Sequence, residues 1–205
     1  MYQTTPFEET RLDVLHALID AHPLGALVTH GEAGLGADHI PFEIGAPTAE
    51  APCGVLRGHV ARANPLWRHD GAVLAVFQGP QAYITPAWYE EKARNGKVVP
   101  TYDYAVVHGH GRLRAIHDAP WLLALLTRLT ARHEAAQAAP WAVGDAPPEF
   151  IDKLLAAIVG IEIPLTRIEG KWKASQNHSA RNQATIAAGL GAAHPMAALV
   201  NPARP

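Results

Sequence analysis

The chain has 205 residues, of which 48% are hydrophobic and 18% are charged, and its formal net charge is −2. This composition excludes an intrinsically disordered chain and is typical of a globular protein with a substantial core. The slightly acidic charge argues against broad electrostatic attraction to nucleic acid.

Three further features of the sequence indicate the compartment. No run of 18 apolar residues occurs, so we expect no membrane span. The N-terminal segment lacks the basic and apolar regions of a secretory signal. Cys53 is the only cysteine, so an internal disulfide cannot form. We therefore expect a protein of the reducing cytoplasm.

The first part of the chain predicts one helix and then short strands. The segment TPFE at residues 5–8 has the form of a capping box, and leucines at helical spacing follow it. These features predict a helix over about residues 6–21. The predicted strands that follow cover residues 25–30, 38–44 and 54–60, and the turn GEAGLG favours a hairpin between the first two.

The middle of the chain predicts a short helix and more strands. Asn64 precedes Pro65 and is a suitable cap for a short helix that ends near Trp67. Gly79-Pro80 predicts a turn that separates two strands. The strands predicted here cover residues 72–78, 81–85 and 106–116.

The last part of the chain predicts three helices and one strand. Asp118 begins a helix whose leucines form one apolar stripe. A proline-rich linker over residues 139–148 separates it from a second helix, which runs from Phe150 to about Ile158. A final strand over residues 160–169 and a short helix over residues 180–188 follow.

These strands do not alternate with helices as they do in βαβ units. Their hairpin-like spacing predicts an α+β fold, in which a mostly antiparallel barrel or sandwich carries added helices. No domain boundary is visible in the sequence. We therefore predict a single domain over residues 1–190 and a C-terminal tail over residues 191–205.

An aromatic segment interrupts the predicted strands between Tyr83 and Arg112. Its expected loop carries four aromatic residues, which are Trp88, Tyr89, Tyr102 and Tyr104. Flat rings with one polar tip suit an aromatic cofactor, because they stack on its face and hydrogen-bond its rim. The alternative is a long loop that packs on its own barrel, and composition alone does not decide between the two.

Two polar segments are candidate phosphate sites. In LRGHVARANPLW, at residues 56–67, basic side chains cluster where a strand gives way to a short helix, a junction that offers backbone N–H groups to an anion. Between Arg167 and Arg181 basic residues outnumber acidic ones by three, which suffices for one phosphate but not for a duplex. The alternative for the second segment is an ordinary solvated face.

His108 and His110 would share one face of a strand, and His117 is near them. No carboxylate or cysteine follows at ligand spacing, so the pair indicates a polar or ligand-facing strand surface rather than a metal centre. We predict no metal ligand.

Five motifs together resemble one known family. HIPF, GHVARANPLW, YITPAWY, VPTYDYAVVHGHGR and KASQN occur in the order and spacing of the PaiB-type FMN-binding regulators, from the first helix to about Leu190. The chain departs from the family's pattern in VPTYDY, where VPTWNY is usual and Asp103 replaces an amide. A second departure is KASQN, where KLSQN is common.

The resemblance implies an FMN-binding split β-barrel of the pyridoxamine-phosphate-oxidase type. It further implies a homodimer with FMN in the groove between the subunits. By this likeness, Arg57 and His59 lie near the FMN phosphate and Gln78 lies near the isoalloxazine ring. The residues that we predict to bind FMN are His39, Arg57, His59, Arg62, Asn64, Gln78, Tyr102, Lys173, Ser175 and Gln176.

The family name implies a negative regulator of transcription. Direct contact with DNA is left open, because the net charge of the chain does not support it. Two alternatives stand beside the regulator. One is an FMN-dependent oxidoreductase or flavin reductase, since the related fold hosts both. The other is a haem-binding split barrel, for which the histidine-rich strand 108–117 is the only feature in favour.

Overall fold

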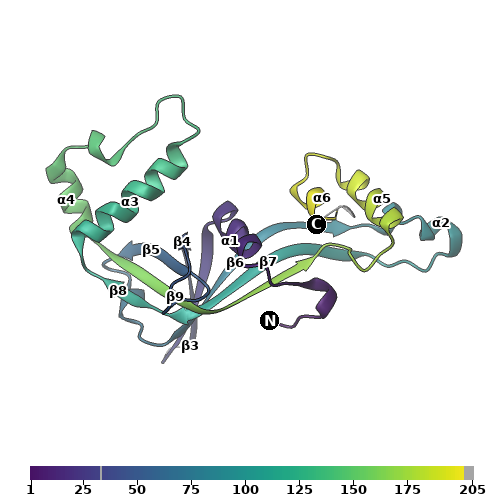
Figure 1. The fold of residues 1–205 in the computed structure, drawn as a ribbon, viewed down its shortest axis with the longest axis horizontal. Helices are drawn as coiled ribbons and strands as arrows, with labels where there is room; N and C mark the ends of the chain where they lie inside the picture. The colour runs from purple at the N-terminus through teal and green to yellow at the C-terminus, as the bar shows by residue number, and fades with distance from the viewer. Residues whose placement is uncertain (33, 201–205) are drawn as a thin grey trace. The chain divides into compact units, whose positions relative to one another are not determined.

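The computed structural model describes residues 1–32 and 34–200, and the chain divides into two compact units. The first unit consists of Met1–His22, Phe77–His108 and the described residues from Glu169 onward. The second unit consists of Pro23–Val76, without residue 33, and Gly109–Ile168. Three long strands pass through both units (Figure 1), namely β6 (Ala72–Ile84), β7 (Thr101–Arg112) and β9 (Ile158–Lys173).

The first unit contains helices from both ends of the chain. Helix α1 (Leu12–Ala21) buries one face, because Leu15, Leu18 and Ile19 recur at helical spacing. Near the other end, α5 (Ala180–Leu190) contacts α6 (Pro195–Val200). The core cluster of this unit joins both of these helices to β6 and to the segment that follows it, and it consists of Ala82, Ile84, Tyr89, Ala174, Ile186, Met196 and Val200.

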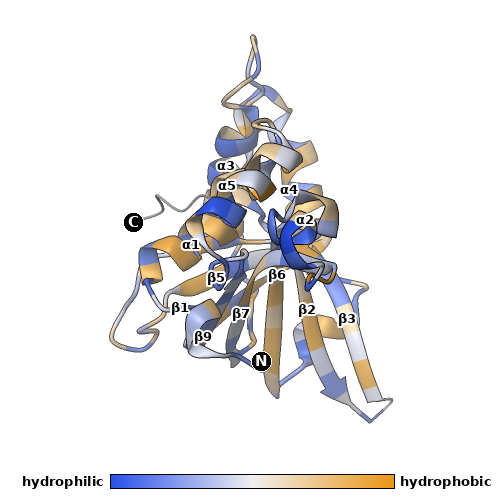
Figure 2. Cartoon of the chain, turned by 90° about the vertical axis from the view of Figure 1, so that its right-hand side faces the viewer, coloured by the Kyte–Doolittle hydropathy of each residue, from blue (hydrophilic) through white to orange (hydrophobic). Residues whose placement is uncertain are grey.

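The remaining elements of the first unit are short. They are η1 (Thr5–Phe7), β1 (Glu8–Glu9), η3 (Pro86–Trp88) and α2 (Glu91–Asn95). Strand β1 pairs with β9 in antiparallel register. Helix α2 is largely hydrophilic (Figure 2), which agrees with the absence of buried residues among its five described positions.

The second unit is built on antiparallel strand pairs. Strand β2 (Leu24–Gly31) pairs with β3 (Gly34–Pro41) and with β6. Strand β5 (Val55–Ala61) lies between β4 (Glu43–Gly45) and β9, and β8 (Arg114–Ile116) also pairs with β9. The hydrogen-bonded order of the strands is β3-β2-β6-β7-β9-β5-β4.

The helices of the second unit are η2 (Pro65–Arg68), α3 (Ala119–Glu134), η4 (Val143–Asp145) and α4 (Pro148–Ala156). The Asp118 carboxylate caps α3 by accepting a hydrogen bond from the Trp121 backbone N–H at 2.7 Å. Leu122, Leu125 and Leu129 form the buried face of α3, and this helix contacts β5. None of the described helices is both long and apolar enough to cross a bilayer.

The elements differ from the sequence prediction at several places. The helix predicted over residues 6–21 begins only at Leu12, because Glu8 and Glu9 pair with β9 instead. Gly79-Pro80 does not break a strand, because β6 continues through both residues. A proline removes only its own N–H from the ladder, so a long strand tolerates it where that group needs no partner.

The third difference concerns the aromatic segment. Tyr102 and Tyr104 lie on β7 rather than in a loop, and Tyr89 is 4% exposed in the core of the first unit. These positions favour the interpretation in which much of the segment packs on its own chain. Helix α6 lies within the segment that was predicted as a tail.

A glycine on β7 provides a test of strand packing in the second unit. A Cβ atom at Gly111 would overlap the Pro164 carbonyl oxygen and the Ile163 side chain, whereas one at Gly144 would meet nothing within 4 Å. We expect Gly111→Ala to lower the free energy of unfolding by about 1–3 kcal/mol, since backbone cannot yield to the new methyl group. Urea unfolding monitored by circular dichroism measures the loss. Gly144→Ala is the matched control, and an equal effect of both substitutions would contradict the packing described here.

Candidate functional site

A pocket of about 510 Å³, lined by both polar and apolar side chains, lies in the first unit. Its walls come from the start of β7, the end of β9, the start of α5 and the segment around α2. We call it the Lys173 pocket. The lining residues that matter below are Tyr89, Lys97, Thr101, Asp103, Lys173, Ser175, Asn177, His178, Ser179 and Asn182.

A buried carboxylate organises this pocket. Asp103 is fully buried, and its Oδ2 accepts a hydrogen bond from Ser175 Oγ at 2.5 Å. Its Oδ1 accepts one from Lys173 Nζ at 3.3 Å, so the same contact is an ion pair. A buried charge is tolerated only when it is paired and hydrogen-bonded, and Asp103 meets both conditions.

The ammonium group of Lys173 donates all of its hydrogen bonds to acceptors within the chain. Besides Asp103, its Nζ donates to Thr101 Oγ1 at 2.5 Å and to the Tyr102 carbonyl oxygen at 2.6 Å. An ammonium group has three N–H donors, and these three acceptors account for all of them. Lys173 therefore ties the end of β9 to the start of β7.

Ser175 adopts an unusual backbone conformation. Its φ is 57°, and it is the only non-glycine residue with positive φ in the described part of the chain. A side chain in this region costs about 1–3 kcal/mol unless the surroundings impose it, and such residues cluster at functional sites. Here the hydrogen bond to Asp103 holds the hydroxyl, and Ser175 is 2% exposed.

The opposite wall connects α2 to α5. The Asn182 side chain accepts a hydrogen bond from the Glu90 backbone N–H at 3.2 Å, and it donates to the Glu91 carboxylate, which lowers the pKa of Glu91. Burial raises the pKa of the Tyr89 hydroxyl, and the charge of Asp103 adds to this effect. Tyr89 therefore stays a neutral phenol in the physiological range, and its ring contacts that of His178 at 5.0 Å between centroids.

The sequence-predicted residues of the first unit fall at several places. Lys173 and Ser175 line the pocket, whereas Tyr102 contributes its carbonyl oxygen to Lys173 and exposes half of its side chain. Gln176 bonds to the backbone of Trp172 and Ala174, which closes the turn after β9. Gln78 is exposed on β6.

In the second unit, three of the residues predicted to bind FMN already have partners within the chain. Arg57 forms an ion pair with Glu162 at 3.0 Å, and Arg62 donates to the backbone carbonyl oxygens of Ala156 and Ile158 at 2.7 and 2.9 Å. Asn64 caps η2 by accepting from the Leu66 N–H, as predicted, and donates to Asp38 at 2.7 Å.

Two further predicted residues of the second unit lie on β3 and β5. His39 is opposite Ala26 in the hairpin and is exposed. His59 lines a second pocket of about 330 Å³, which we call the His59 pocket, together with Pro41, Leu126, Leu129, Thr130, His133, Glu134 and Trp141. Burial lowers the pKa of His59, so its imidazole is neutral at pH 7.

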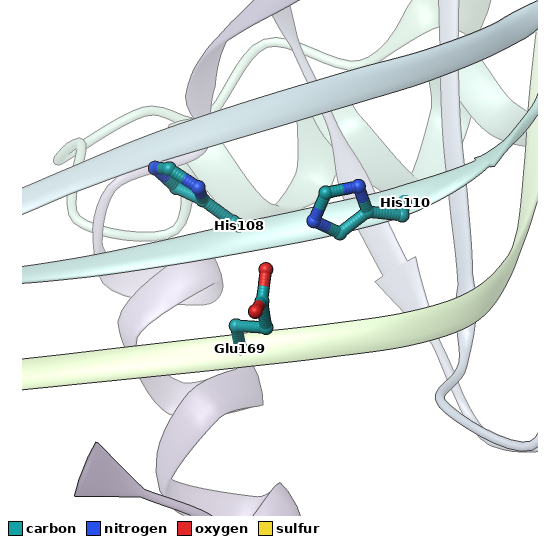
Figure 3. Close-up of side chains that lie close together, drawn as sticks. All are labelled: His108, His110 and Glu169. Carbon is teal, nitrogen blue, oxygen red and sulfur yellow. The ribbon is translucent and has the colours of Figure 1, made fainter. Parts of the chain in front are cut away.

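His108 and His110 on β7 lie close to Glu169 on β9 (Figure 3), with one ligand atom of each residue within 4.8 Å of the others. The sequence did not indicate Glu169 as a third candidate ligand, because it is distant from both histidines along the chain. The arrangement is nevertheless poor for a cation. The Met1 amino group lies 3.5 Å from Glu169, and Arg167 bonds to His110 Nδ1 at 3.1 Å. Arginine is only a donor, so that nitrogen already accepts a hydrogen bond.

The predicted FMN-binding residues omitted Asp103 and Asn182, and Tyr89 was predicted only as one of four aromatic candidates for stacking on a cofactor. For Asp103 a signal existed, since it alternates with Ala105 and Val107 and therefore faces the same buried side of β7. Asn182 carried no such signal, because its role follows from contacts between distant segments.

Comparison with known proteins defines the class. The chain belongs to the family described as "Putative FMN-binding domain", whose model matches residues 1–167. The predicted cofactor, FMN, and the predicted family are thereby confirmed.

Individual relatives cover most of the chain. A protein of Emericella nidulans named as uncharacterized is 34% identical over 212 residues, which span 86% of this chain and 84% of that protein. The Bacillus subtilis protein named "Protease synthase and sporulation protein PAI 2" is 29% identical over 182 residues, which span 87% of this chain and 84% of the relative.

Solved structures confirm the predicted α+β split-barrel fold. The FAD and haem binding protein from Mycobacterium smegmatis is similar with a TM-score of 0.58 at 16% identity, over 81% of this chain and 73% of that one. The flavocytochrome Anf3 from Azotobacter vinelandii gives 0.60 at 11% identity, over 84% and 72%. At these identities the likeness concerns the fold alone.

The Asp103 network yields a stability prediction. We expect Asp103→Ala to lower the free energy of unfolding by about 2–4 kcal/mol, because Lys173 and Ser175 lose their buried acceptor. Asp103→Asn, which restores the amide usual in the family, keeps one acceptor oxygen and should cost less. Urea unfolding measures both, with the exposed Asp152→Ala as control. If Asp103→Ala matched this control, the network would contribute nothing to stability.

His59 yields a pH prediction. The unfolded imidazole takes up a proton near pH 6.5, whereas the folded one does so only at lower pH. The unfolded state therefore binds more protons below about pH 6.5, and stability falls as the pH drops through that value. We expect His59→Phe to remove this part of the pH dependence in urea unfolding between about pH 7.5 and 5. The exposed His30→Phe should retain the wild-type profile.

Proposed function

We propose that this protein is an FMN-binding negative regulator of transcription of the PaiB type, which acts as a homodimer with FMN held between its subunits. Membership of the FMN-binding family supports the flavin part. The regulatory part is supported by the likeness to the Bacillus subtilis protein, whose name refers to protease synthesis and sporulation and which this chain matches over 84% of its length.

The main structural support for the proposed flavin site is the Lys173 pocket. Its volume of about 510 Å³ lies within the range of cofactor pockets. Asn177, His178 and Ser179 at its rim offer donors and acceptors to the polar edge of a flavin, and the neutral Tyr89 offers a ring. When bound, FMN supplies a redox-active ring. The Asp103 network keeps the protein side of this site in one geometry.

The FMN phosphate needs a cation in the same proposal. Lys97 is the lining cation whose ammonium group has no partner among the described residues, and its position at the pocket makes it the first candidate. Arg57, His59 and Arg62, the phosphate residues implied by the family, are the alternative to Lys97 and lie outside the Lys173 pocket. Their use would require the phosphate to compete with Glu162 for Arg57 and with backbone carbonyls for Arg62.

One experiment measures both FMN binding and dimer formation. Native mass spectrometry of the reconstituted protein should give a dimer of two 22.0 kDa chains that retains FMN. Lys97→Ala should weaken FMN about tenfold, because a charge-assisted contact is lost, and should change riboflavin affinity far less. Lys153→Ala, on the exposed face of α4, is the control. An apo monomer at micromolar protein with added FMN would contradict the proposal.

The regulatory role is tested on DNA. A gel shift with DNA from upstream of the chain's own gene should show specific retardation, and affinity should fall as salt rises from about 50 to 200 mM. Specificity is judged by competition with unrelated DNA. Steady NAD(P)H oxidation by the FMN-loaded protein, with no retardation at any salt concentration, would replace the regulator with an oxidoreductase.

A further inference from the structure

The His59 pocket differs in character from the Lys173 pocket. Its walls are apolar along Pro41, Leu126, Leu129 and Trp141, and its polar groups belong to His59, Thr130, His133 and Glu134. All of these residues belong to the second unit. The first wall comes from the end of β3, and the facing wall comes from the last two turns of α3 and the segment after it. The pocket is therefore a hydrophobic slot with a few hydrogen-bonding groups.

One nitrogen in this slot has no partner. His59 Nδ1 is buried from solvent, and no donor or acceptor of the described residues lies within hydrogen-bond distance of it. The great majority of buried polar side-chain atoms have a partner, and an unpaired one is destabilising. A buried nitrogen that lacks a protein partner beside a cavity indicates a missing ligand or water.

The chain also fixes the segment that bounds the slot. The Trp141 backbone N–H donates to Glu134 Oε2 at 3.1 Å, which holds the segment after α3 against the end of that helix. The Trp141 side chain lines the pocket and remains 46% exposed. An indole that is half exposed beside an apolar cavity offers a flat surface on which a ring can stack.

We propose that the His59 pocket binds a small, flat, uncharged molecule with an apolar body and one hydrogen-bonding group that pairs with His59 Nδ1. Phenol and indole represent this class. The volume of about 330 Å³ is near the lower end for ligand pockets, so it suits a molecule of one or two rings. An anion is disfavoured, because the imidazole is neutral and Glu134 is the charged neighbour. The site is separate from the Lys173 pocket, so this inference rests on the proposed flavin site there, with Lys97 rather than His59 as the phosphate cation.

Isothermal titration calorimetry with phenol, indole and toluene tests this. Phenol and indole should bind saturably, and toluene, which has the same apolar body without a hydrogen-bonding group, should bind about tenfold more weakly than phenol. His59→Phe keeps the ring volume without the nitrogen. It should weaken phenol about tenfold and leave toluene unchanged, whereas the exposed His30→Phe should change neither.

A second pair of variants separates occupation of the slot from loss of the hydrogen bond. Thr130→Phe places a ring in the pocket and should abolish binding of all three probes. Thr127→Phe makes the same substitution on the exposed face of the same helix and should bind normally. Circular dichroism confirms that each variant is folded before titration. Binding that survives Thr130→Phe, or no saturable binding of any probe to the wild type, overturns the proposal.

The last arm uses the FMN-loaded protein. Phenol should bind it with the affinity measured without FMN, because the proposed flavin pocket belongs to a different set of residues. Stoichiometric displacement of phenol by FMN would instead place the flavin in the His59 pocket, and the separate site would be withdrawn. If FMN does not bind at all, the proposed flavin function is contradicted. The inference about the His59 pocket is then still tested by the titrations with phenol, indole and toluene.

Discussion

The hydrogen bonds to the buried Asp103 carboxylate are the constraint on which the rest of the first unit depends. A carboxylate that is fully buried on a strand must be paired, and both of its partners come from β9 and the turn that follows. The Ser175 hydroxyl reaches it from a left-handed backbone conformation, which reverses the chain after Ala174. One electrostatic requirement on β7 thus fixes the path of the chain from β9 into α5.

That path has consequences for packing and for the pocket. Ala174 and Ile186, on either side of the turn, enter the same core cluster as Tyr89. Ser179 then caps α5 by accepting from the Asn182 N–H, and Asn182 reaches across to Glu90. The polar rim of the Lys173 pocket is therefore supported on one side by core packing and on the other by paired side chains. A binding site whose lining is held by such contacts loses little entropy when a ligand orders it.

The sequence predicted the fold class, the family and most elements, because these depend on periodicity, caps and motif order. The cap at Asn64, the start of α3 at Asp118 and the hairpin of β2 and β3 are local features, and local signals sufficed. The positive φ of Ser175 could not be predicted, since serine has no preference for it and a residue 72 positions away imposes it. The surroundings of His59 were equally hidden, because they come from α3, far along the chain.

The segment between Arg167 and Arg181 shows why a count of charges in the sequence overestimates the capacity of a segment to bind phosphate. Its sequence has an excess of positive charge, yet each cation has a partner within the chain. Arg167 bonds to His110, Lys171 donates to the Tyr2 carbonyl oxygen, and Arg181 forms an ion pair with Glu90. Lys173 completes the set with its three acceptors. An incoming phosphate must replace these contacts, and the exposed pair of Arg181 is the least costly to replace because solvent already screens it. The charge that decides anion binding is therefore the part left unpaired after folding, which the sequence alone does not reveal.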